Sequence, residues 1–159
     1  MSLLGKTDAE IVELVAAQEQ RLVFDAFPIS LAHDIGQKLV ETAKAQKAPV
    51  VIDLTRSGQC LFHCALDGAT PDNAVWVLRK NRVVQRFHRS SLYMGALCRT
   101  KGCSLEEKFL LPQNAFAAHG GAFPITLRDS GVIGSVTVSG LPQIEDHDMV
   151  VSALAEFAG

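Results

Sequence analysis

The segment Ala122–Val151 constrains the fold more than any other part of the chain. Two apolar, β-rich runs stand on either side of Arg128-Asp129-Ser130-Gly131, whose residue types are typical of turns. Gly140-Leu141-Pro142 then interrupts the second run, and an acidic stretch typical of a helix start follows. The pattern predicts a strand, a turn, a strand, a tight loop and a helix. It contains no obvious catalytic group, so it tells more about architecture than about chemistry.

The rest of the chain adds a second hairpin and several helices. Pro49–Leu54 and Gln59–Leu66 are predicted strands joined by a turn at 55–58, and Arg21–Phe27 is a further short β-like run. Helices are expected at 8–20, 30–43, 72–99 and 145–157. Hairpins in place of crossover connections indicate an antiparallel sheet carrying helices, an α+β fold, in one domain over residues 1–159.

Length and charge limit the function classes. A chain of 159 residues suits one domain, and its formal net charge of -2 does not favour nucleic acid or an anionic membrane as partner. The apolar runs are far shorter than the ~20 residues that span a bilayer, and the N-terminus lacks the pattern of a signal peptide. We therefore expect a cytoplasmic protein without membrane or nucleic-acid partners, leaving open whether Met1–Leu3 is native.

The four cysteines are expected to be reduced, structural thiols. Strand alternation would place Cys60 and Cys64 on one face, about 13 Å apart, and His63 on the other. Cys98 and Cys103 also lack the CxxC spacing of zinc or redox sites. One reactive thiol, or pairing across subunits, is the alternative. No two histidines show a metal-ligand spacing either, so the sequence supports no local metal site.

The predicted long helix carries the main binding candidates. Arg79, Arg82, Arg86 and Arg89 are spaced three, four and three residues apart, which stacks them along one helical face beside Lys80 and His88. Guanidinium groups so close repel one another unless anions neutralise them. The stripe would then either pair with acids of a neighbouring helix or subunit, or bind an anionic small molecule. Nucleic acid is the least favoured partner, because the stripe is short.

Two further positions attract a binding hypothesis. Trp76, the single tryptophan, lies near the start of the same helix, where a core or interface anchor is the alternative to a ligand platform. His119 precedes Gly120 and Gly121, which allow close backbone approach and could expose N–H groups to an anion. A tight entry into the strand at Ala122 would explain the glycines equally.

The acidic stretch 145–148 invites a metal hypothesis, although acids in a first helical turn are explained by the helix dipole alone. Neither a GxSxG nucleophile motif nor a glycine-rich nucleotide motif occurs. No catalytic residue is therefore assigned, and whether the protein is an enzyme stays open.

Two blocks of sequence carry a family resemblance. The downstream block runs from Gly120-Gly121 through Phe123-Pro124-Ile125 and Ile133-Gly134 to Asp146, and the upstream block contains Asp72-Asn73, Trp76 and Arg79-Lys80. Together they resemble the GlcG/HbpS-like family, also called the heme-degrading domain family, in its uncharacterised branch. The resemblance covers nearly the whole chain.

The resemblance implies a profilin-like domain, with an antiparallel sheet of about five strands flanked by helices on its faces. It also implies homo-oligomers built from dimers. Relatives of the HbpS type bind heme and are linked to its breakdown, whereas this branch has no established reaction.

Three hypotheses follow. The first is a non-catalytic, homo-oligomeric binding protein. The second is a protein that binds heme, another anionic tetrapyrrole or a small molecule, with heme degradation as its extension. The third is an enzyme with His119 as acid–base group. In each case chemistry is expected where the Gly120-Gly121 segment meets the helix that carries Arg79–Arg89.

Overall fold

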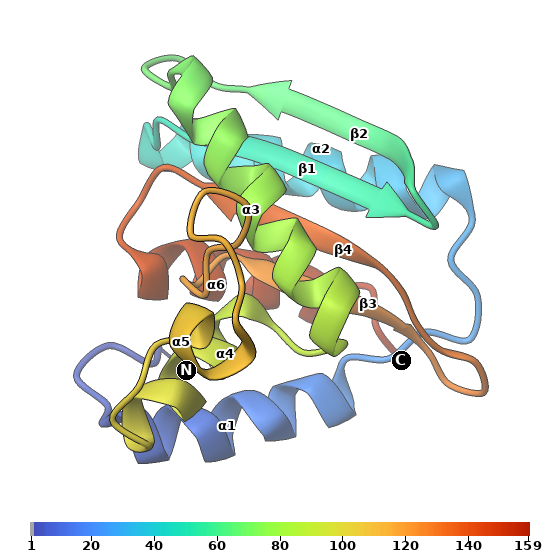
Figure 1. Cartoon of the computed structure of the whole chain (residues 1–159). Coiled ribbons are helices and arrows are strands. Elements are labelled where there is room, and N and C mark those ends of the chain that lie inside the picture. The colour runs from blue at the N-terminus through green and yellow to red at the C-terminus, as the bar shows by residue number, and fades with distance from the viewer. Residues whose placement is uncertain (1) are drawn as a thin grey trace.

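Two antiparallel hairpins form one four-stranded sheet in the computed structural model, which describes residues 2–159 (Figure 1). The strand order is β2-β1-β4-β3, so β1 and β4 pair in the centre and join the two hairpins. Ser57 and Gly58 both have positive φ in the two-residue turn between β1 and β2, the geometry that tight hairpins favour. Both predicted hairpins are confirmed. The strands are β1 Val51–Arg56, β2 Gln59–Ala65, β3 Ala122–Leu127 and β4 Gly131–Ser139.

The sheet has four strands where about five were expected. The run Arg21–Phe27 contributes only an isolated parallel bridge, in which Phe24 accepts from the Arg128 amide and donates to the Thr126 carbonyl. Helix α1 extends through Arg21, the first residue of the predicted run, and Pro28 directly before α2 ends it.

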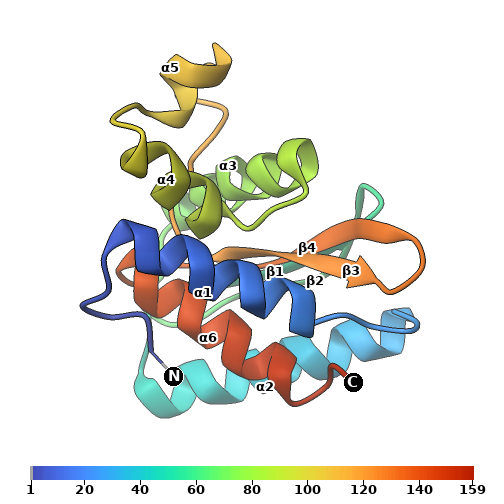
Figure 2. The ribbon, with the colours of Figure 1, turned by 90° about the horizontal axis from the view of Figure 1, so that it is seen from below.

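Six helices surround the sheet and divide between its faces. Figure 2 shows α2 and α6 beneath the sheet, α3 above it, and α1 at the side close to α4. No helix among residues 2–159 has the length and apolar character needed to cross a membrane. The helices are α1 Asp8–Arg21, α2 Ile29–Gln46, α3 Pro71–Phe87, α4 Ser91–Thr100, α5 Leu105–Phe109 and α6 Gln143–Ala155.

The predicted single helix over 72–99 is wrong, because the chain breaks between α3 and α4. His88 adopts a left-handed conformation with φ of 56°, and Ser90 begins the next helix by accepting from the Tyr93 amide at 3.1 Å. Glu19 of α1 holds the break, since its carboxylate accepts from the Ser90 amide and from the Arg89 guanidinium. The capping serine and this distant carboxylate together turn the chain, and the arginine stripe is divided.

The two faces of the sheet differ in polarity. Ile52, Leu54 and Val136 are fully buried in the large apolar core shared with α2 and α6. The face toward α3 buries polar residues, among them Asp53 and Thr137. Alternation along a strand sends neighbouring residues to opposite faces, which explains the division. Candidate chemistry is therefore expected on the α3 side.

We predict that the buried His147 makes stability depend on pH. Burial lowers the pKa of this imidazole to about 3, and Nε2 has one partner, the Gln18 side-chain oxygen at 2.8 Å. A lowered pKa means that stability is complete above the unfolded value of 6.5 and is lost as the pH falls toward the folded value. Between pH 6.5 and pH 5 this loss is about 2 kcal/mol.

This loss is measured by urea unfolding of the wild type and of His147→Asn at pH 6.5 and at pH 5. The stability advantage of the wild type should shrink by that amount at pH 5. Asp146, whose raised pKa acts in the opposite direction, is common to both proteins and cancels. An advantage that is constant with pH would show that His147 is not buried in its neutral form.

Candidate functional site

A buried ion pair links α3 to α6. The ammonium of Lys80 lies 3.1 Å from Oδ2 of Asp146, and the two side chains are 4% and 1% exposed. Lys80 also donates to the Val138 carbonyl at 3.4 Å. Asp146 accepts from the amides of Gly140 at 3.3 Å and Leu141 at 3.0 Å. Each charged group is thus hydrogen-bonded beyond its partner, which a buried pair requires.

Burial shifts both members toward their neutral forms. It lowers the pKa of Lys80, and it raises the pKa of Asp146 to about 6 although Lys80 and two amides oppose that shift. The carboxyl group is still ionised at pH 7. The Lys80–Asp146 pair is therefore charged, but the two charges cancel and the pair contributes no net charge to the space next to it.

Gly121 makes room for this pair, and Gly120 makes room for the start of α6. At Gly121, with φ of 138°, an added Cβ would lie 2.3 Å from the Val138 carbonyl oxygen and 2.8 Å from the Lys80 ammonium. At Gly120 it would lie 2.2 Å from the Gln143 carbonyl oxygen, and the Gly120 amide donates to the Gln143 side chain at 3.1 Å. The predicted close approach at these glycines is thus toward the protein itself.

Above the pair lies a pocket of about 220 Å³, which we call the Trp76–His119 pocket. The Trp76 and His119 rings meet edge to face with centroids 5.3 Å apart, and the Arg79 guanidinium lies 4.4 Å from the Trp76 ring centroid. Asp72 accepts from the Trp76 indole at 3.2 Å and fixes the ring. The lining residues are Asn73, Trp76, Lys80, His119, Ser139, Gly140, Leu141, Gln143 and Asp146.

The surroundings of His119 are cationic. Burial lowers the pKa of His119 first, and the positive charges of Lys80, Arg99 and Arg79 lower it further, against a weaker effect of Glu106. The imidazole is therefore neutral at pH 7 and keeps one donor and one acceptor nitrogen. A neutral ring among cations is an environment that an incoming anion would stabilise.

The chain matches a known protein family. A model of the family described as haem-degrading protein HbpS-like matches residues 27–155. The chain belongs to the HbpS-like family. It is 51% identical over 153 residues to a UPF0303 protein of Streptomyces coelicolor, covering 96% of this chain and 94% of that protein.

Solved structures of related fold agree with the assignment. The crystal structure of the Ybr137w protein has a TM-score of 0.84 and 36% identity, covering 92% of this chain and 87% of that one. The heme complex of PduOC has a TM-score of 0.69 and 20% identity, covering 84% and 97%. The α+β fold of the HbpS-like family is thereby shown for this chain.

The structure brings part of the predicted site together. Trp76, Lys80 and His119 line the pocket, Arg79 stacks on its wall, and Gly120 and Gly121 contact its lining residues. These residues come from α3 and from the segment before β3.

The other cationic candidates lie elsewhere. Arg82 donates to the Ala115 carbonyl at 3.1 Å, and Arg86 lies over the Phe87 ring. His88 lines a separate pocket beside Gly134. Arg89 forms a salt bridge with Glu19 of α1, so one arginine of the stripe is neutralised by an acid of another helix.

The role of Asp146 in this HbpS-like protein was not predicted from the residues around it. Asp146 contacts Lys80, whereas the neighbouring His147 contacts Gln18. These two residues of the acidic stretch therefore do not form one metal site. The available signal was the Gly140-Leu141-Pro142 loop before the helix, whose amides needed an acceptor. Sequence spacing alone could not join Asp146 to Lys80, which is 66 residues away.

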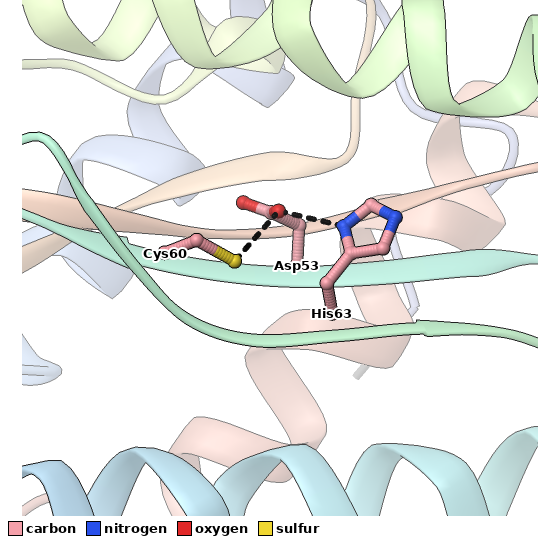
Figure 3. Close-up of side chains that lie close together, drawn as sticks. All are labelled: Asp53, Cys60 and His63. Carbon is pink, nitrogen blue, oxygen red and sulfur yellow. Dashed lines mark hydrogen bonds and ion pairs between the residues drawn. The ribbon is translucent and has the colours of Figure 1, made fainter.

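A second polar cluster contradicts the predicted alternation in β2. Asp53, Cys60 and His63, here called the Asp53 cluster, lie with one side-chain donor atom of each within 4.8 Å of the others (Figure 3). Cys60 and His63 were expected on opposite faces. A β-bulge shifts the register, because Leu54 pairs with Phe62 whereas Thr55 pairs with Cys60. The unpaired Leu61 reverses the alternation.

We predict that breaking the buried pair is far more costly than breaking a surface pair. Asp146→Ala should reduce the free energy of unfolding by about 3–5 kcal/mol, because Lys80 would be left buried and unpaired. The matched control is the Lys38–Glu156 pair, at 3.2 Å and half exposed, where Glu156→Ala should cost less than about 1 kcal/mol.

Urea denaturation of both variants and of the Lys80→Met/Asp146→Leu double variant measures the effect. The double variant should recover much of the loss, since no unpaired charge remains. Equal costs at the two pairs would contradict the buried geometry.

Proposed function

We propose that this HbpS-like protein binds a small anionic molecule in the Trp76–His119 pocket. The observation that carries the proposal is the neutral His119 ring, which lies edge to face against Trp76 close to the positive charge of Arg79. Carboxylate and phosphate groups are the natural partners of such an arrangement, because charge-assisted hydrogen bonds are the strongest available there.

Arg79 supplies uncancelled positive charge. Its guanidinium donates to the carbonyls of Gln113 and Phe116, which are not anionic, and its Nε is buried without a hydrogen-bond partner among residues 2–159. Lys80, in contrast, is neutralised by Asp146. The excess charge at the pocket therefore comes from Arg79, close to the aromatic wall.

The size of the pocket limits the ligand. Pockets for drug-sized ligands enclose roughly 300–1,000 Å³, and this one encloses about 220 Å³. A carboxylate or phosphate compound of a few heavy atoms, with an apolar part against Trp76, matches that volume. Binding without turnover is the function proposed; a proton-transfer role for His119 stays a separate hypothesis.

Trp76 reports on its own pocket, because it is the single tryptophan. Titration with phosphate, pyrophosphate and short dicarboxylates should change its fluorescence saturably for at least one of them. His119→Ala should weaken that binding about 10-fold, through the loss of a hydrogen bond to an anion. Binding should tighten as the pH falls from 7 to 5.5, because the anion favours the protonated imidazole.

The control is His33→Ala on α2, whose ring contacts the Leu61 carbonyl away from the pocket. It should bind like the wild type. The proposal fails if no anion perturbs Trp76, or if His119→Ala binds with unchanged affinity and unchanged pH dependence.

Heme is the second candidate ligand. The family description and the PduOC heme complex favour it. His119 favours it as well, because histidine is a usual ligand of heme iron. The pocket of one chain, however, is smaller than those of drug-sized ligands and does not enclose a macrocycle. Titration with hemin, followed at the Soret band, decides between the two ligands. A saturable shift that is lost in His119→Ala would make heme, and not a small anion, the ligand of this pocket.

We also propose that the protein self-associates, in homo-oligomers built from dimers. Apolar side chains stay exposed on α3 and beyond α5, with Val75 at 50%, Leu78 at 55% and Leu110 at 90% exposure. Strand β2 is in addition a free sheet edge. Exposed apolar groups and unpaired edges both favour contact with another chain.

Light scattering coupled to size exclusion should give an even multiple of the chain mass. Val75→Lys/Leu78→Lys should lower the mass, because two charges would be buried at the contact. A monomer at every concentration would exclude self-association.

A further inference from the structure

The geometry points to the Asp53 cluster as a Zn²⁺ site, formed by one carboxylate, one thiolate and one imidazole, with the fourth coordination position open to solvent. The site is separate from the Trp76–His119 pocket. It does not depend on the function proposed there.

The bulge in β2 assembles the three donors. His63 pairs directly across from Asp53, and the unpaired Leu61 turns Cys60 to the same face. Nδ1 of His63 lies 2.9 Å and Sγ of Cys60 lies 4.0 Å from the same oxygen, Oδ2 of Asp53 (Figure 3). Bulges commonly re-aim side chains next to functional sites.

The distances suit a tetrahedral ion. With Zn–N and Zn–O bonds near 2.0 Å and a Zn–S bond near 2.3 Å, the N–O and S–O separations around zinc would be about 3.3 and 3.5 Å. The N–O and S–O separations would each have to change by about half an ångström, and the Sγ–Nδ1 separation, which is below 4.8 Å, would have to close to about 3.5 Å. Cys60 is exposed and His63 is 44% exposed, so both side chains are free to make these changes.

Asp53 is held in place for this role. The side chain is buried, and its other oxygen, Oδ1, accepts from the Thr55 hydroxyl at 2.8 Å and from the side-chain Nδ2 of Asn81 at 3.1 Å. Asn81 in turn accepts from Thr137. These bonds occupy Oδ1 and leave Oδ2 facing Cys60 and His63, the outer-shell arrangement that orients metal ligands.

The donor set selects the metal class. Calcium and magnesium take oxygen ligands, whereas thiolate and imidazole together suit zinc. Three protein ligands with one open position are the pattern of zinc sites that hold a water or a substrate. On binding, the Cys60 thiol loses its proton to solvent and the thiolate forms the Zn–S bond.

The test is a Zn²⁺ titration of the full chain after chelator treatment, in competition with a chromophoric chelator. The wild type should bind one Zn²⁺ per chain, and Cys60→Ser and His63→Gln should each weaken binding at least 10-fold. Cys64→Ser is the matched control, because this thiol is on the same strand but lines a pocket with α2 on the opposite face. It should bind Zn²⁺ like the wild type.

Because Cys60 and His63 are exposed, their variants should keep the wild-type circular dichroism without metal. Wild type that binds no stoichiometric Zn²⁺ would overturn the proposal. Equal loss in Cys64→Ser and Cys60→Ser would overturn it as well. Neither result bears on the anion titration of the Trp76–His119 pocket.

Discussion

The buried pair of Lys80 and Asp146 is the constraint on which the α3 side of the molecule depends. It joins α3 to α6 and to the loop after β4, and it requires a glycine at 121, because a side chain there would collide with the Lys80 ammonium and the Val138 carbonyl. A buried pair of this kind contributes little net stability compared with apolar residues. Its presence here defines where α3 and α6 sit relative to the sheet and forms the floor of the Trp76–His119 pocket.

Both candidate sites lie on the same polar face of the sheet. Lys80 and Asn81 are neighbours on α3, and they reach the Trp76–His119 pocket and the Asp53 cluster respectively. The opposite face, under α2 and α6, is an apolar core. Stability and chemistry are thus separated by strand alternation, which explains how one small sheet can support two polar sites.

Several elements could be predicted from residues alone. The turn residues Ser57-Gly58 and the glycine at 131 identified both hairpins, because only certain residues adopt positive φ there. The break at His88 was missed although Ser90 is a good helix cap, since the strong helical periodicity of 72–99 concealed it. The bulge at Leu61 was missed because alternation assumes uniform pairing, and one extra residue reverses every later side chain.

For this HbpS-like protein the α+β class and the two hairpins follow from local turn chemistry and short-range periodicity, and the family follows from two blocks of matching residues. The pairing of the charged residues follows only from the tertiary structure. Lys80 reaches Asp146, Arg89 reaches Glu19, and Cys60 reaches Asp53 and His63. Such contacts depend on helix packing and strand register, which bring together residues whose separation in sequence carries no signal of their proximity.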